Sequence, residues 1–150
     1  MKYGKFLLSV LFLFMTLPSF AQTSADIERI LDQKEISCEQ AAWFTLAAAL
    51  EEPIEGSQAA FNLAVEKGWL PQDAQGSDPI TCGGFSYLAM QAFGMKCGMM
   101  YRIFENKRYA YREMKYRGYI AGRAWSNSAV SGEQFLQILG NVMADLGGEW

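Results

Sequence analysis

The stretch PITCGGFSYLAMQAFG, from Pro79 to Gly94, combines a helix start with an unusual first turn. Thr81 is a residue type that caps helices, and apolar residues recur behind it at the spacing of one helical face. These apolar residues are Phe85, Leu88, Ala89 and Ala92. Between the cap and this face stand Cys82, Gly83 and Gly84, and glycine disfavours helix. The pattern predicts a helix packed on a core, with a first turn that serves a purpose other than helix formation.

Two other stretches have the same pattern: ISCEQAAWFTL, residues 36–46, and VSGEQFLQILG, residues 130–140. In each of the three, a β-branched apolar residue precedes Ser or Thr, and an apolar helix follows. Ser37 and Ser131 are each followed three residues later by Gln, which makes an S-x-x-Q capping box. The middle stretch keeps its cap but has Gly84 where the box needs Gln. The three stretches therefore predict the second helices of a repeated unit.

The similarity continues upstream at a spacing of fifty residues. AAFNLAVEKGWL ends at Leu70 and YAYREMKYRGYI ends at Ile120, so that Gly68 matches Gly118. Each unit is predicted to be a helix ended by a left-handed glycine, a loop of about ten residues and a capped second helix. Helices are expected at residues 25–34, 38–50, 57–67, 82–94, 108–117 and 132–146. The second helices are the more apolar, so we expect an all-α protein in which they form the centre and the first helices cover them.

The N-terminus has the pattern of a secretory signal peptide. Lys2 and Lys5 precede the apolar run FLLSVLFLFM, and Ser19 and Ala21 are small residues at the positions that signal peptidase requires. We expect residues 1–21 to be removed, export to the periplasm or cell envelope, and no transmembrane anchor after cleavage. Residues 22–150 are then one domain. Its units are expected at about residues 24–50, 57–94 and 108–146.

Composition excludes several functions. Loss of Lys2 and Lys5 would leave 11 basic against 16 acidic residues, so nucleic acid is not an expected partner. The chain contains no histidine, which excludes Ser-His-Asp or Cys-His catalysis and His-ligated zinc. Carboxylates at Glu51, Glu52 and Glu55 are an enzymatic alternative, but no second acid is brought to a defined distance from them. We therefore expect no catalytic residues, no metal site and no cofactor.

Three cysteines, Cys38, Cys82 and Cys97, favour one disulfide and one free thiol in an exported chain. Cys38 and Cys82 occupy equivalent positions directly after the caps of two helices, and a bond between them would leave Cys97 free. A bond between Cys82 and Cys97 is harder, because the intervening helix separates its ends by roughly 18 Å. Alternatively, a helix N-terminus lowers the pKa of a thiol, and either Cys38 or Cys82 is then a reactive thiolate.

The pattern resembles the S-layer homology domain, a module of about fifty residues that usually occurs in three copies. The stretches that carry the resemblance are GWLP with PITCGGF, GYIAG with AVSGEQF, and a shortened EISCEQA. The resemblance implies three helix-loop-helix units in a pseudo-threefold bundle, with grooves between units that hold a cell-wall polysaccharide. The family contacts its anionic, pyruvylated ligand through an Arg, and this sequence has Cys38, Cys82 and Gly132 at the corresponding positions.

The TCGG turn and two aromatic residues are candidate ligand contacts. If Thr81, Gly83 and Gly84 line a groove, they leave backbone amides bare at a helix N-terminus, where a ligand can approach closely. The alternative is that glycine makes room for a neighbouring unit. Trp69 and Tyr119 follow the helix-ending glycines and are either platforms for sugar rings or apolar contacts that close the helix ends.

The segment from Tyr101 to Trp125 is basic in an otherwise acidic chain and is interleaved with tyrosines. Arg117 and Arg123 are the preferred contacts for an anionic envelope glycan, since Arg binds carboxylate and phosphate in a bidentate manner. The alternative is that the basic residues form a solvated face. The sequence thus predicts a non-catalytic module that binds or organises an envelope glycan, such as peptidoglycan or a wall polysaccharide. Its rival is a module that binds another envelope protein or forms a structural oligomer.

Overall fold

The computed structural model describes residues 19–50, 54–96 and 98–147. Over these residues the chain forms seven helices and no strand, so the prediction of an all-α protein is confirmed. The helices are α2 (Ser19–Leu31), α3 (Cys38–Ala49), α4 (Ser57–Glu66), α5 (Cys82–Ala92), α6 (Met99–Ile103), α7 (Lys107–Tyr116) and α8 (Gly132–Gly147). The predicted signal peptide lies outside the described residues except for its last three, which begin α2.

All six expected helices are present; the bounds of five lie within two residues of expectation, and those of α2 differ more. α2 begins six residues earlier than expected and ends three residues earlier, at Leu31. α6 was not expected, because a helix of five residues is too short to show a helical period. None of the described helices combines the length and the apolar character needed to cross a membrane.

The predicted caps are present. Ser37 and Gln40 form a complete capping box at the start of α3. The Thr81 hydroxyl accepts a hydrogen bond from the Gly84 amide at 3.1 Å, and Ser131 accepts one from the Gln134 amide at 3.3 Å. Gly68 and Gly118 have φ angles of 72° and 80°, the left-handed conformation expected after a helix.

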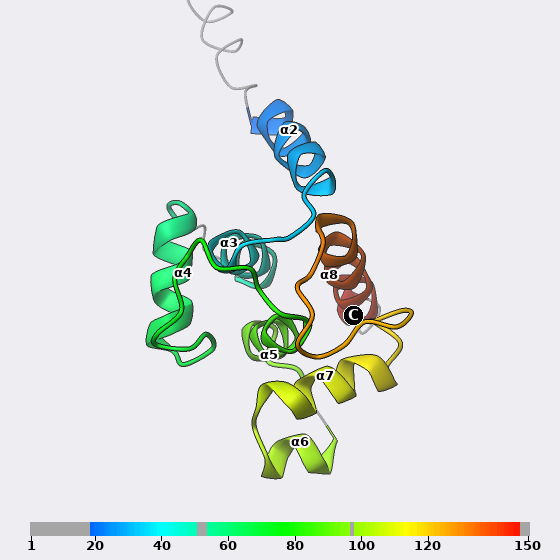
Figure 1. Ribbon diagram of the computed structural model, residues 1–150. Helices are drawn as coiled ribbons and strands as arrows, with labels where there is room; N and C mark the ends of the chain where they lie inside the picture. The colour runs from blue at the N-terminus through cyan, green and yellow to red at the C-terminus, as the bar shows by residue number, and fades with distance from the viewer. Residues whose placement is uncertain (1–18, 51–53, 97, 148–150) are drawn as a thin grey trace, which may run out of the picture.

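α3, α5 and α8 lie together at the centre of the molecule, with α4, α7 and α2 outside them (Figure 1). α4 packs on α3, α7 packs on α5 and α2 packs on α8. Thus each outer helix covers the central helix of a different unit from its own. The ring of Phe135 on α8 lies close to a ring on each of the other two central helices. Its centroid is 4.7 Å from that of Phe85 on α5 and 6.4 Å from that of Phe44 on α3. The central position follows from the apolar sequences of these helices.

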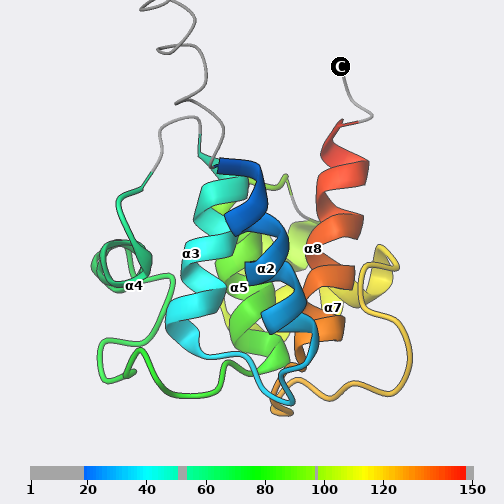
Figure 2. The ribbon, with the colours of Figure 1, turned by 90° about the horizontal axis from the view of Figure 1, so that it is seen from above.

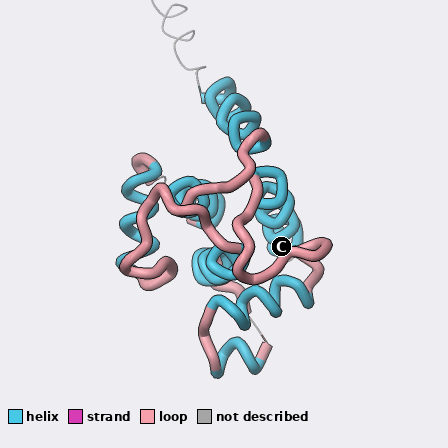
Figure 3. Tube along the Cα trace, viewed as in Figure 1, coloured by secondary structure: helices cyan, strands magenta, loops and turns pink. Residues whose placement is uncertain are grey.

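The residues that precede the three helix caps form a closed ring of main-chain hydrogen bonds. The amide of Ile36 donates to Val130, that of Val130 donates to Ile80, and that of Ile80 donates to Ile36, at 2.8, 3.1 and 2.8 Å. All three side chains are buried. The segments that lead into α3, α5 and α8 consequently gather at one end of the central helices (Figures 2 and 3).

Two loops return to the starts of neighbouring helices at the same fifty-residue spacing. In the first junction, the loop of residues 71–79 meets the start of α3, and the Cys38 amide donates to the Asp78 carbonyl at 2.8 Å. In the second junction, the loop of residues 121–129 meets the start of α5, and the Cys82 amide donates to the Ser128 carbonyl at 2.8 Å. The two loops therefore repeat in backbone structure.

Candidate functional site

A cavity of about 500 Å³ opens between the end of α4, the first junction, the start of α5 and the segment before α7. Three of the residues predicted as ligand contacts line it: Trp69, Thr81 and Gly84. Cys38 also lines it. The volume is within the range of protein sites for small ligands.

Two aromatic side chains face this cavity. Trp69 is partly exposed, and the Lys67 ammonium lies 5.4 Å from the centre of its ring. Tyr87 of α5 is the second aromatic side chain. Burial raises the pKa of Tyr87, and the nearby Glu105 carboxylate raises it further. Its hydroxyl therefore stays neutral at physiological pH and can both donate and accept hydrogen bonds.

The polar lining is mainly acidic. Asp73, Asp78 and Glu105 supply carboxylates, and Lys107 supplies one ammonium. One oxygen of Asp78 accepts from the Gln75 amide at 2.9 Å. Within the part of the chain that the structure describes, no hydrogen bond or ion pair holds the side chains of Asp73, Glu105 or Lys107. These groups can therefore bind hydroxyl or amine groups of a ligand, whereas an anionic ligand would be repelled.

The prediction that the main-chain amides of Cys82, Gly83 and Gly84 in the TCGG turn are free to bind a ligand is wrong, because each of them donates a hydrogen bond within the protein. The Cys82 amide donates to Ser128, the Gly83 amide donates to the Ser126 carbonyl at 2.8 Å, and the Gly84 amide donates to Thr81. A Cβ atom on Gly83 would lie 2.5 Å from the Ser126 hydroxyl oxygen. Gly83 is thus buried because it makes room for the loop of a neighbouring unit, as the alternative held. Gly84 lines the cavity instead.

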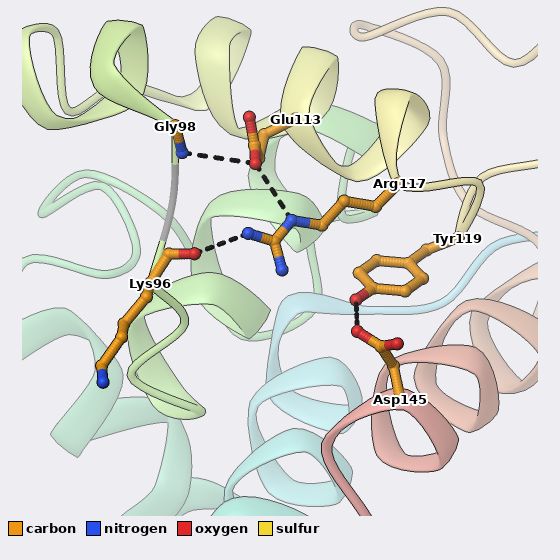
Figure 4. Close-up of polar contacts among 6 residues, drawn as sticks. All are labelled: Lys96, Gly98, Glu113, Arg117, Tyr119 and Asp145. Carbon is orange, nitrogen blue, oxygen red and sulfur yellow. Dashed lines mark hydrogen bonds and ion pairs between the residues drawn. The ribbon is translucent and has the colours of Figure 1, made fainter. Parts of the chain in front are cut away.

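Tyr119 does not offer a sugar platform, because the residue is only 5% exposed. Its hydroxyl donates to the Asp145 carboxylate of α8 (Figure 4), and its carbonyl accepts from the Asn141 side chain at 3.2 Å. Burial, together with Asp145, raises the pKa of Tyr119. The alternative assignment, an apolar contact that closes the helix end, is the one that fits Tyr119.

Arg117 is engaged within the protein. Its guanidinium bonds to Glu113 at 3.0 Å and donates to the carbonyl of Lys96 (Figure 4). Glu113 also accepts from the Gly98 amide at 3.4 Å. Arg117 and Glu113 therefore tie the chain around α6 to α7, and the structure places Arg117 away from the cavity. Arg123 is exposed and lies beside Trp125, also away from the cavity.

The predicted disulfide between Cys38 and Cys82 is absent, since both thiols are free and buried. The structure does not favour a reactive thiolate at either position, because burial raises the pKa of both thiols to about 11. The Asp78 carboxylate adds to the effect at Cys38, whereas Lys115 opposes it at Cys82. Loss of hydration is the largest cause of the raised pKa at both positions. Cys97 lies outside the described residues.

Sequence reasoning missed much of the cavity lining. Asp73 and Asp78 are in a loop whose position the repeat had predicted, so their charge was a usable signal. Tyr87 gave no signal because it is a single tyrosine in a mainly apolar helix. Glu105 and Lys107 lie outside the unit of residues 57–94 that supplies most of the lining. Nothing in the local sequence connects residues 69 and 105.

No group of three His, Cys, Asp or Glu side chains within residues 19–50, 54–96 and 98–147 is arranged to hold a metal ion. Of the carboxylates considered for catalysis, Glu51 and Glu52 lie outside these residues, and Glu55 is exposed. No protein-family model matches the chain, and no curated protein or solved structure matches it either.

Proposed function

We propose that the protein is a non-catalytic module of the cell envelope that binds or organises a glycan in the cavity beside Trp69. The observation that carries the proposal is the combination of two aromatic side chains with unpaired polar groups in one cavity of about 500 Å³. A sugar ring stacks its apolar face on an aromatic ring, and its hydroxyls bond to carboxylate, amide or ammonium groups at the edge. Trp69 and Tyr87 would supply the rings, and Asp73, Glu105 and Lys107 the polar contacts.

The arrangement of helices supports an S-layer-homology-like, pseudo-threefold bundle. Each outer helix covers the central helix of another unit, and the ring of hydrogen bonds at Ile36, Ile80 and Val130 is cyclic. The cavity lies where residues of successive units meet, and the resembled family binds its polysaccharide between units. The N-terminal signal pattern supports export to the envelope, where such a polymer is found.

The charge of the cavity favours one class of glycan. Three carboxylates and a single ammonium disfavour a pyruvylated, anionic polymer and favour a neutral or amine-bearing one. The amide-substituted sugars of peptidoglycan strands are neutral, so peptidoglycan is the first ligand to test. This proposal replaces the anionic glycan expected from the basic segment of residues 101–125.

Co-sedimentation with purified, lipid-free peptidoglycan tests the proposal. The matched pair of variants is Trp69→Ala, inside the cavity, and Trp125→Ala, outside it. Saturable binding should weaken by about tenfold in Trp69→Ala, which corresponds to about 1.4 kcal/mol, and should persist in Trp125→Ala. Circular dichroism establishes that both variants are folded.

Soluble wall fragments should compete for the binding. Equal binding by both variants, or binding that such fragments leave unchanged, would contradict a glycan site at Trp69. The remaining candidate would then be the rival function, a module that binds another envelope protein or builds a scaffold.

A further inference from the structure

A second surface of the molecule exposes apolar side chains in a way that the glycan cavity does not explain. Met99, Met100, Ile103 and Phe104, in and directly after α6, are 76, 55, 60 and 47% exposed. Figure 1 shows α6 at the outer edge of the molecule, beyond α7. Four large apolar side chains in six residues of a water-facing segment are unusual, and such patches mark interaction sites.

This segment is held in place rather than loosely attached. Tyr101 is 6% exposed, and its hydroxyl accepts a hydrogen bond from the Gln91 side chain at 2.9 Å. Its ring lies 6.4 Å from that of Tyr87. The Phe104 and Tyr109 rings are stacked with their centres 5.3 Å apart. α6 is therefore anchored through one side while its apolar side chains project outward.

The apolar surface continues along α7. A hollow of about 540 Å³ between α6 and α7 is lined by Met100, Tyr116, Arg112 and Lys115. Lys115 also borders a neighbouring hollow with Arg123 and Trp125. Tyr116 and Trp125 are 89 and 73% exposed. We refer to Met99, Met100, Ile103, Phe104, Tyr116 and Trp125 as the α6 surface.

Basic residues are concentrated in the segment that carries the α6 surface. Residues 96–125 contain eight basic residues against two acidic ones, whereas the remainder of the chain contains five basic and fourteen acidic residues. The basic residues are Lys96, Arg102, Lys107, Arg108, Arg112, Lys115, Arg117 and Arg123. Most of these are exposed, and Arg112 and Lys115 line the same hollow as Met100 and Tyr116, together with the acidic residue Glu113. The surface is thus apolar and cationic together.

This combination matches the boundary of an anionic phospholipid bilayer. Apolar side chains enter the region between headgroups and acyl chains, while Lys and Arg contact the phosphates. Tyr and Trp favour the same depth. A protein partner is disfavoured, because the centre of a protein interface is depleted of charge, and here Arg112 and Lys115 line the same hollow as Met100 and Tyr116.

We propose that the α6 surface docks the protein on an anionic phospholipid membrane. Met99, Met100, Ile103 and Phe104 enter the interface, and Arg102, Arg112, Lys115 and Arg123 bind lipid phosphates. The docking does not depend on the glycan site. It places the Glu105 to Lys107 edge of the cavity next to the membrane, since those residues connect α6 to α7.

Vesicle co-sedimentation of the protein, purified after export, tests the proposal. The vesicles are phosphatidylglycerol mixed with phosphatidylethanolamine, or phosphatidylcholine alone. The variants are Met99→Ser with Ile103→Ser, which keeps all charges, and Arg112→Gln with Lys115→Gln, which keeps the apolar residues. Met143→Ser is the control, because Met143 is 46% exposed on α8, outside the α6 surface.

The protein should bind the anionic vesicles, and added salt should weaken the binding. Both double variants should bind about tenfold more weakly, and the Met143→Ser control should bind as the parent protein does. Equal binding to phosphatidylcholine would overturn the proposal, as would unchanged binding by both double variants. Failure to bind any vesicle would also overturn the proposal. If the α6 surface were then required for capture of an envelope protein, the surface would be a protein interface.

Discussion

The first and second junctions have equivalent main-chain hydrogen bonds, but the larger side chain and the glycine stand on opposite elements in the two. In the first junction the Glu39 amide donates to the Gly76 carbonyl at 2.9 Å. In the second junction the Gly83 amide donates at 2.8 Å to the carbonyl of Ser126, which is fifty residues after Gly76. In the first junction the helix carries the large side chain and the loop carries glycine. In the second junction the helix carries glycine and the loop carries the larger residue. Close packing between units therefore places a glycine on one side of each contact, and the element that carries the glycine differs between the two junctions.

The same two regions differ in charge and in exposure. The first loop carries Asp73 beside the partly exposed Trp69, whereas the second carries Arg123 at the matching position, close to the buried Tyr119. α8 covers Tyr119 through Asp145, whose equivalent in the other unit is Met95, beyond the end of α5. A repeated backbone thus supports an acidic cavity in one place and a basic surface in the other.

The largest effect is expected at the third junction, where α2 takes the place of a loop. The Gly132 amide donates to the Gln33 carbonyl at 2.9 Å, and a Cβ atom at Gly132 would lie 1.6 Å from the Ile30 carbonyl oxygen. Gly132→Ala should lower the free energy of unfolding by about 3 kcal/mol, because a backbone atom must move. Gly140→Ala is the control on the same helix, where nothing lies within 4 Å, and it should be neutral or stabilising. Urea unfolding measures both, and equal effects would show that α2 does not pack on α8 in this way.

The exchange of side chains at the second junction predicts a rescue. Gly83→Ala should cost about 2 kcal/mol, because the new Cβ atom would meet the Ser126 hydroxyl oxygen at 2.5 Å and the Ser126 carbonyl oxygen at 3.0 Å. Ser126→Gly in the same chain should recover a large part of the loss, since it reproduces the order of sizes found in the first junction. A double-mutant cycle from chemical denaturation measures the coupling. Additive effects of the two substitutions would contradict direct contact.

The two buried thiols predict a loss of stability at high pH in both junctions. Burial raises the pKa of Cys38 and Cys82 from an ordinary value near 9.0 to about 11. Above pH 9 the unfolded chain releases these protons while the folded protein retains them, so stability is complete below pH 9 and falls as the pH rises toward 11. The free energy of unfolding should decrease by about 1 to 2 kcal/mol for each thiol between pH 8 and pH 10.5.

Cys82→Ala and Cys38→Ala variants should each reduce this pH dependence. In the native protein at pH 8, Cys82, which is 0% exposed, should react with a thiol reagent only as fast as the protein opens. Rapid labelling of Cys82 without unfolding would show that it is not buried.

The smallest change in stability is expected at Gly84, where a side chain should stabilise the protein, unlike a side chain at Gly83. Gly84→Gln would complete the S-x-x-Q capping box with Thr81, and its Cβ atom would meet only Thr81 and Ile80, at 3.1 and 3.5 Å. The free energy of unfolding should rise by about 0.5 to 1 kcal/mol. Because Gly84 lines the cavity, the Gln side chain should also weaken glycan binding. Thermal unfolding and peptidoglycan co-sedimentation of the same variant measure the two effects, and a gain in both would contradict the position of the site.

By itself, the sequence determined six of the seven helices in the described residues, the caps at Ser37, Thr81 and Ser131, the helix-ending glycines and the fifty-residue spacing. These features depend on hydrogen bonds and backbone preferences among near neighbours, so a short window of residues contains the information. Only the tertiary structure decided that Tyr119, Cys38 and Cys82 are buried, that the amide of Gly83 is already bonded, and that Trp69 shares a cavity with Glu105. Burial and local charge at a side chain depend on segments far away in the chain, and no local pattern records which segments will meet.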